Sequence, residues 1–382
     1  MHLSPPSAAY VHVPFCAHRC GYCDFTTYAG LLPLVPAYFD AVRREIARAA
    51  PGLDAVRTAP LATVYFGGGT PSLVDEAELA ATMRALDRAF GFATDLEATL
   101  EVNPGTLRRG APEAWRAAGF NRASVGVQSF SDPLLRALDR IHTADEAEAA
   151  LRVLARAGFR NLSVDLMLGL PGQAESDVVE AVDRAAALGA VHVSFYSLTV
   201  EEGTPFAARY PDGRGLPDDD EERRLYDAAL SALARHGFAQ YEISSAARPG
   251  FRCRHNLVYW SAEGYLGFGA GAHAYVDGVR RGNLPGIEAY IRALSADGSA
   301  VASRETVDAD GAAAETMLLG LRMNDGVSRT AYAARFGESP EARFGHALAA
   351  LVRDGLVSDD GDRIRPTRKG IDFSNVVSRA FL

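Results

Sequence analysis

The chain has 382 residues, 48% of them hydrophobic and 23% charged, as in ordinary globular proteins large enough for one main domain and a smaller one. Its net charge of -9 argues against a general surface for nucleic acid or anionic membranes. The start, MHLSPPSAAYVHVPF, lacks the cationic and apolar regions of a signal peptide, and no run approaches the roughly 18 apolar residues of a spanning helix. We therefore expect a cytoplasmic protein without an integral membrane segment or a nucleic-acid partner.

Short apolar, β-rich runs alternate with longer amphipathic segments over the first part of the chain. The predicted strands are 10–14, 63–66, 98–102, 123–127, 162–166 and 191–198. The predicted helices are 36–50, 75–90, 112–118, 144–157, 176–188 and 218–236. Asp75 and Asp218 are expected as N-caps, and Gly119, Gly158, Gly189 and Gly237 stand where helices should end. Six such units predict a parallel sheet and favour an open, partial (β/α)6 barrel, although the pattern alone also permits a doubly wound sheet.

The amino-acid composition and pattern change twice after this region. Residues 246–283 are rich in glycine and aromatic side chains, and from residue 305 three helices precede a hairpin predicted over 359–373. These changes divide the chain into predicted domains 1–240, 241–304 and 305–382. The last resembles a winged helix, but its helices carry no basic stripe, so we expect a structural role rather than DNA binding.

Three of the four cysteines are clustered as C-x3-C-x2-C at Cys16, Cys20 and Cys23, a poor disulfide framework. Three thiolates can hold a cubane iron–sulfur cluster and leave one iron open to an exchangeable ligand. Zinc is the alternative, with His12 or His18 as the fourth ligand.

A glycine-rich loop, GGGTP at residues 67–71, follows the second predicted strand. Glycines let the backbone pass close to a ligand and offer it amide donors and carbonyl acceptors without a Cβ clash. A structural zinc knuckle has no use for such a loop, so its position relative to the cysteines favours the cluster. A tight strand-to-helix turn is the alternative reading of the glycines alone.

Polar side chains stand where the other predicted strands end, which is where β/α barrels gather their functional groups. These residues are Glu101, Asn103, Gln128, Ser129, Asp165, Tyr196 and Thr199. The alternative is a polar layer inside the barrel without a cofactor.

Taken together, YVHVPFCAHRCGYCDF, YFGGGTPSL, EVNPGT, RASVGVQSF, RIH and VDLMLGLPGQ resemble the radical S-adenosylmethionine (SAM) superfamily, in its coproporphyrinogen oxidase-like branch. The resemblance implies an α/β fold: a partial (β/α)6 radical SAM barrel, a small mixed region and a winged-helix-like α+β C-terminal domain. It implies that Cys16, Cys20 and Cys23 bind a [4Fe-4S] cluster whose open iron is chelated by SAM. It also implies SAM contacts at Tyr10, Gly68, Gly69, Thr70, Glu101, Gln128, Arg140 and Asp165.

Two departures identify the branch more narrowly. The oxygen-independent coproporphyrinogen III oxidases have a further cysteine where this chain has Phe25, and a longer segment before the cluster than the 15 residues here. The run HNLVYW at 255–260 is instead similar to the HNxxYW signature of the heme chaperone family HemW. That family implies heme binding and transfer to an acceptor protein. The competing functions are the oxidase reaction, an oxidative decarboxylation in porphyrin biosynthesis, and anaerobic heme breakdown.

The same run is a plausible heme site on its residues. His255 offers an imidazole for heme iron, with Cys253 and His273 as rival ligands. Cys253 and His255 would face the same side of a strand. Tyr259 and Trp260 are expected to stack on the porphyrin, and nearby arginines to meet its propionates: Arg248, Arg252 and Arg254. The alternative is a buried aromatic cluster with a structural histidine. The sequence leaves a homodimer open.

Overall fold

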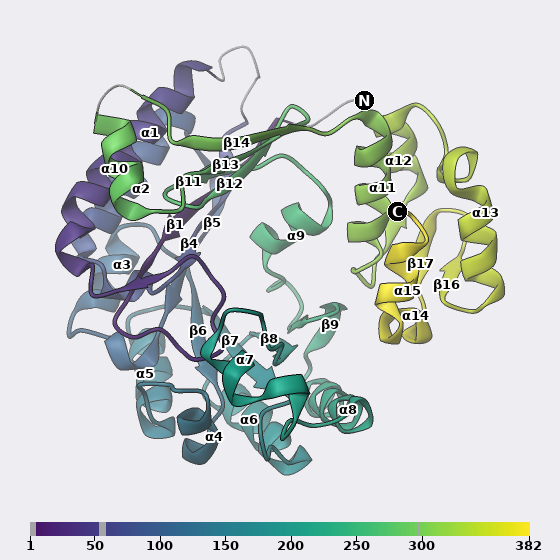
Figure 1. Ribbon diagram of the computed structural model, residues 1–382, viewed down its shortest axis with the longest axis horizontal. Coiled ribbons are helices and arrows are strands. Elements are labelled where there is room, and N and C mark those ends of the chain that lie inside the picture. The colour runs from purple at the N-terminus through teal and green to yellow at the C-terminus, as the bar shows by residue number, and fades with distance from the viewer. Residues whose placement is uncertain (1–4, 53–58, 296–297) are drawn as a thin grey trace.

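The computed structural model describes residues 5–52, 59–295 and 298–382, and its centre is a curved nine-stranded sheet (Figure 1). The strand order is β11-β1-β4-β5-β6-β7-β8-β10-β9. Their bounds are β1 (Ala8–Val13), β4 (Leu61–Gly68), β5 (Phe92–Val102), β6 (Arg122–Gln128), β7 (Asn161–Leu168), β8 (His192–Ser197), β9 (Ala239–Glu242), β10 (Ser245–Ala247) and β11 (Leu266–Phe268). The pairs from β11 to β8 are parallel, and β10 and β9 run antiparallel. All six predicted strands are confirmed as its parallel core.

Helices flank this sheet, and most of them cover its outer face (Figure 1). They are α1 (Val35–Gly52), α2 (Glu76–Phe90), α3 (Ala111–Ala117), α4 (Asp132–Ala137), α5 (Ala144–Arg156), α6 (Glu175–Ala187), α7 (Pro205–Arg209) and α8 (Asp219–Arg235). The predicted caps are confirmed: the side chain of Asp75 accepts from Ala77 N, and that of Asp218 accepts from Glu221 N. The apolar faces of α1, α2, α3, α5, α6, α8 and of the strands form the main core, whereas Leu134 of α4 and Phe206 of α7 belong to a smaller, separate apolar cluster.

The barrel is open, because its edge strands β11 and β9 do not pair with each other. The seven-residue helix α9 (Arg254–Trp260) is linked to both sides of this opening. His255 on α9 hydrogen-bonds to Thr63 of β4, and the amide of Cys253 donates to the hydroxyl of Tyr241 on β9. The prediction that Cys253 and His255 lie on a strand is wrong, because Cys253 is the N-cap of this helix.

A three-stranded antiparallel sheet and a helix follow, and lead into a C-terminal unit with its own apolar core. The first set is β12 (His273–Val276), β13 (Val279–Asn283), β14 (Val301–Thr306) and α10 (Ile287–Ser295). The C-terminal set is α11 (Ala309–Gly320), β15 (Val327–Ser328), α12 (Arg329–Phe336), α13 (Pro340–Arg353), β16 (Val357–Asp359), β17 (Arg363–Pro366), α14 (Arg368–Asp372) and α15 (Ser374–Arg379). Three helices and a β16–β17 hairpin confirm the winged-helix-like expectation. The hairpin is shorter than predicted, because Thr367 caps helix α14 by accepting from Gly370 N.

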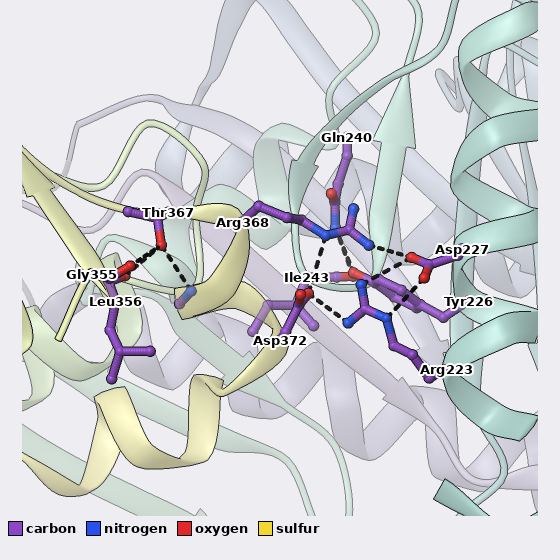
Figure 2. A network of polar contacts seen from close by, with 11 residues as sticks. Arg223, Tyr226, Asp227, Gln240, Ile243, Gly355, Leu356, Thr367, Arg368 and Asp372 are labelled. Carbon is purple, nitrogen blue, oxygen red and sulfur yellow. Dashed lines mark hydrogen bonds and ion pairs between the residues drawn. The ribbon is translucent and has the colours of Figure 1, made fainter. Parts of the chain in front are cut away.

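Charged side chains fasten this C-terminal unit to helix α8 (Figure 2). Arg223 Nη1 lies 2.6 Å from a carboxylate oxygen of Asp372 on α14. Arg368 on α14 pairs with Asp227 on α8 and, at 3.1 Å, with Asp372. A shared network of this kind fixes the two surfaces more firmly than isolated exposed pairs would. No helix among the described residues is both long and apolar enough to cross a membrane.

Candidate cofactor site

The cysteine loop is held at both ends by β-type pairing. β2 (Phe15–Cys16) pairs with β3 (Tyr28–Ala29), which closes the loop between them. The far end of β4 supplies two more bonds, from Gly69 N to Val13 O at 2.9 Å and from Thr70 N to Phe15 O at 2.8 Å. The loop therefore sits over the carboxyl ends of β1 and β4, as expected for a functional loop of a β/α barrel.

The glycine loop packs against β1 more closely than any other residue would allow. A Cβ at Gly69 would lie 2.5 Å from the oxygen of Val13, and one at Gly68 would lie 2.2 Å from the His12 ring. The amide of Gly68 donates to Glu101 Oε2 at 2.9 Å. The amides of this loop at 68, 69 and 70 are thus satisfied within the protein. The part of the prediction that offers these amides to a ligand is therefore wrong, whereas the offer of carbonyl acceptors to a ligand stays a prediction, and the glycines also allow close packing.

A cavity of about 280 Å³ lies under the cysteine loop. All three clustered cysteines line it, as do most predicted SAM contacts: Gly68, Gly69, Thr70, Glu101, Gln128, Arg140 and Asp165. Tyr10 is outside this lining. Its hydroxyl hydrogen-bonds to His12 Nδ1 at 2.9 Å, and its ring stacks on Tyr65, which does line the cavity.

Donor groups surround the three sulfur atoms. Thr70 Oγ1 donates to Cys16 Sγ at 3.5 Å, Arg140 Nη1 donates to Cys20 Sγ at 3.4 Å, and Cys23 Sγ lies 4.0 Å from a threonine hydroxyl. Burial raises the pKa of the Cys16 thiol, and the bond from Thr70 opposes this. Donors aimed at sulfur stabilise the thiolates that metal binding requires.

The donor set fits a cluster better than the zinc alternative drawn from the sequence. His12 uses both ring nitrogens, since its Nε2 hydrogen-bonds to Thr26 O at 2.8 Å and its Nδ1 to Tyr10. Within the described ranges, no three His, Cys, Asp or Glu side chains converge on a point suited to one metal ion. A cubane does not need such convergence, because each thiolate binds a different iron.

Glu101 is a buried carboxyl group with two fixed donors. Tyr65 donates to its Oε1 at 2.8 Å, and the Gly68 amide holds its Oε2. Burial raises the pKa of Glu101 to about 7, although the Tyr65 bond opposes the shift. Burial likewise raises the pKa of Asp165, whose carboxylate accepts from Ser124 Oγ at 3.2 Å. A cationic ligand would let both groups ionise.

Strained backbone turns Gln128 into the cavity. Its φ is +66°, unusual for a residue other than glycine, and the β6–β7 register shifts between Val125 and Gln128. Tyr196 donates to its Oε1 at 3.1 Å. Arg140 is oriented by a 2.8 Å bond from Nη2 to Gly126 O, and its buried Nε has no hydrogen-bond partner. Strain and an unsatisfied donor at one cavity are typical of a ligand site.

Sequence reasoning missed several lining residues: Tyr65, Arg122, Ser194 and Asn256. The sequences of the strands did contain a signal for these residues. Arg122 and Ser124 lie two positions apart on β6, so they share the inward face, and polar residues recur at such positions. Arg122 is 1% exposed, and its Nε and Nη1 lack hydrogen-bond partners.

His255 does not line the cavity under the cysteine loop, but it lies next to Tyr65, which does. It is 1% exposed, and its ring stacks on Tyr65 with centroids 5.1 Å apart. Its Nδ1 bonds to Thr63 and its Nε2 to the hydroxyl of Tyr259, both at 2.8 Å. Burial lowers the pKa of His255 to about 3, so the ring is neutral. An iron ligand at this position would require one of these two bonds to break. His273, the rival ligand, is exposed on β12.

A three-cysteine loop over an open parallel barrel, with a polar cavity beneath it, defines a protein of the radical SAM class. Residues 10–185 match the Radical SAM superfamily, and residues 307–373 match the HemN C-terminal domain. Coproporphyrinogen III oxidase (HemN) from Escherichia coli, a radical SAM enzyme of known structure, superposes with a TM-score of 0.85 at 23% identity. That superposition covers 99% of this chain and 90% of HemN, and confirms the expected fold.

Relatives with similar amino-acid sequences identify the family more narrowly than the fold does. The heme chaperone HemW of Bacillus subtilis is 36% identical over 98% of this chain and 99% of its own length. HemW of Mycobacterium tuberculosis is 38% identical over 99% of this chain and 95% of its own. The chain belongs to the HemW family.

Proposed function

We propose that this protein is a cytoplasmic heme chaperone, which binds heme and a SAM-ligated [4Fe-4S] cluster and transfers the heme to an acceptor protein. The observation that carries the proposal is near-full-length similarity to proteins named heme chaperone HemW. Phe25 supports the proposal. The oxidases that the chain resembles have a further cysteine at this position, whereas here the side chain is a phenylalanine that is 63% exposed.

The cluster would be held by Cys16, Cys20 and Cys23, which line one cavity. Three ligands leave an iron for the amino and carboxylate groups of SAM. When the cluster and SAM are bound, they supply one-electron reduction chemistry. The protein's own part is to orient: Arg140, with an unpartnered Nε, suits the carboxylate, and Glu101 suits the ammonium or ribose hydroxyls.

The first test is anaerobic reconstitution of the full chain with iron and sulfide. We expect a reduced-cluster EPR signal that changes when SAM is added. The variants Cys16→Ala, Cys20→Ala and Cys23→Ala should each lose it. Cys253→Ala is the matched control, since Cys253 is a buried free cysteine outside the cavity lining and its variant should keep the cluster.

The second test addresses heme. Hemin titration should give a saturable Soret band, and the loaded protein should pass heme to an apo-heme protein faster than free hemin does. A chain that neither binds hemin nor speeds transfer is no heme chaperone. Conversion of coproporphyrinogen III to protoporphyrinogen under anaerobic, reducing conditions would instead establish the oxidase alternative.

A further inference from the structure

The cysteine loop contacts a segment that follows β8 in the chain. This segment, residues 199–217, contains α7 and a short 3-10 helix, and we call it the strap. The amide of Phe206 on α7 donates to Gly21 O at 3.0 Å, and the Phe206 ring packs edge-on against Tyr22, with ring centroids 6.1 Å apart. Figure 1 shows α7 beside the loop that follows β1. The strap therefore touches the cysteine loop between its second and third cysteines.

This contact is close enough to require glycine at position 21. A Cβ added to Gly21 would lie 2.4 Å from Asp139 Oδ2 and 2.7 Å from Phe206 Cε1. The carboxylate could turn aside, but the Phe206 ring could not. It is fully buried, in the apolar cluster that includes Leu134 and Leu138. The backbone of the cysteine loop is thus packed between the strap and the turn after α4.

An arginine of the strap holds the same turn. Arg209 donates from Nη2 to both carboxylate oxygens of Asp139, at 2.9 and 3.3 Å, and from Nη1 to Ala137 O at 3.1 Å. Its guanidinium also covers the Phe206 ring, 4.9 Å from the ring centroid. Asp139 has a φ of +56°, which is uncommon for a residue other than glycine. The turn is therefore strained, and the strap supplies contacts that oppose its relaxation.

Arg140 connects this turn to the cofactor cavity. It follows Asp139 directly in the chain, so the backbone angles at position 139 set the direction of the Arg140 side chain. Arg140 Nη1 donates to Cys20 Sγ at 3.4 Å, and Nη2 donates to Gly126 O at 2.8 Å. A shift of the turn would move the guanidinium away from the sulfur and from the place proposed for the SAM carboxylate.

We infer that the strap sets the positions of Cys20 and Arg140 relative to the cluster and SAM. Phe206 and Arg209 are its positioning residues, because the first packs on the cysteine loop and the second holds the turn that leads into Arg140. The inference rests on the proposed function, and it adds to the cofactor site two residues that do not line the cavity. Ligand-binding groups must be held within about 0.5 Å of their productive geometry, which requires such support from outside the site.

The experiment compares Arg209→Gln with its control Arg214→Gln, both in the full chain reconstituted anaerobically with iron and sulfide. Both arginines are exposed on the strap, and Arg214 forms no ion pair with a described residue. We expect the natural chain and both variants to bind equal amounts of iron and to melt at the same temperature. Arg209→Gln should nevertheless need at least threefold more SAM for half of the EPR change, whereas Arg214→Gln should match the natural chain.

A second readout needs no cofactor. In the cofactor-free chain, amide hydrogen exchange of residues 17–24 should be at least threefold faster in Arg209→Gln than in the natural chain, and unchanged in Arg214→Gln. Phe206→Leu keeps an apolar side chain but loses the ring that packs on Tyr22, so the same residues should exchange faster in this variant too. Exchange of residues 61–66, in β4, should be the same in all of these proteins.

The inference is overturned if the natural chain gives a SAM-dependent EPR change and Arg209→Gln needs no more SAM for it. This holds even where the loop of the variant exchanges faster, because the strap would then only stabilise the fold. Equal exchange of residues 17–24 in the natural chain and in both strap variants would contradict the inference as well. A natural chain that forms no SAM-responsive cluster would instead reject the proposed function at the cofactor site, and this inference with it.

Discussion

His255 and Trp260 leave helix α9 in different directions: His255 Nδ1 bonds to Thr63 in the barrel wall, and Trp260 lines a cavity toward the C-terminal unit. Five positions on an α-helix turn the side chain by about 140°, so the two ends of the HNxxYW run cannot share one ligand face. Asn256, next to His255, lines the cavity of the cysteines. One short helix therefore lies between the cofactor cavity and a second cavity beside the C-terminal unit, and residues of this helix line both.

Arg140→Lys is expected to weaken SAM binding. The guanidinium reaches Gly126 O and Cys20 Sγ at once, through two nitrogens, and a single ammonium cannot reproduce that fork. Hydrogen bonds to charged groups are worth about 1.5–3 kcal/mol, so affinity should fall about tenfold to a hundredfold. Titrating SAM into the reduced, reconstituted protein and following the EPR change measures this. Arg136→Lys, at an exposed position of α4, should titrate like the natural chain.

Gly69→Ala is expected to disrupt the seat of the cysteine loop. The new methyl group would lie 2.5 Å from Val13 O and 2.8 Å from Phe15 O, both backbone atoms that cannot turn aside. Displacing this backbone costs on the order of 1–3 kcal/mol. We expect a lower melting temperature and less iron bound after reconstitution. Gly345→Ala is the control, because its methyl group meets nothing closer than 4.0 Å; equal iron content in both variants would contradict this account.

Glu101 is expected to make the free energy of unfolding depend on pH. Its folded pKa of about 7 lies above its ordinary 4.5, so between these values the folded chain holds a proton that the unfolded chain releases. Its contribution to stability is therefore complete below pH 4.5 and is lost as the pH rises through 7, by roughly 3 kcal/mol.

Urea denaturation of the cofactor-free chain at several pH values measures this dependence. Glu101→Gln should flatten the fall in stability between pH 5 and pH 8, whatever its absolute stability, because the amide does not titrate. Glu288→Gln changes an exposed carboxylate on α10 and should leave the slope as it is. A Glu101→Gln profile parallel to that of the natural chain would show that another group titrates.

Asp372→Asn is expected to loosen the C-terminal unit from helix α8. Asp372 is the carboxylate shared by Arg223 and Arg368 in the network of Figure 2. Partly exposed pairs contribute about 0.2–1 kcal/mol each, so the global loss should be small. Hydrogen exchange should nevertheless quicken selectively in α14 and the facing turn of α8. Glu288→Gln, which removes the exposed pair with Arg292, should change exchange only locally.

Local patterns predicted the barrel because its signals lie close together in the chain. The cap of Asp75 bonds two residues away, and each strand is followed by its own helix, so periodicity and capping are enough to find them. Gln128 and Asp165 were found as strand-end residues for the same reason. Arg122 was missed, because its role depends on which face of β6 turns inward, and that face is chosen by the neighbouring strands.

The region around the HNxxYW run was predicted least well. The segment at 253–260 suggested an extended run, whereas it folds as a helix whose fixed contacts come from Thr63, 192 residues earlier, and from Tyr241 on β9. Contacts at such sequence separation override local preference, because burial against a preformed surface outweighs the small differences in intrinsic propensity.

The amino-acid sequence by itself determined the three-cysteine loop, the strand-end polar residues and the parallel sheet of β/α units, since these follow from spacing and from periods of two and 3.6 residues. Only the tertiary structure decided which way the HNxxYW helix faces, that the glycine amides are already bonded, and that Trp260 and Tyr332 meet at one cavity. Those relationships join segments far apart in the chain. They depend on the packing of α9 between the barrel and the C-terminal unit, which no local pattern encodes.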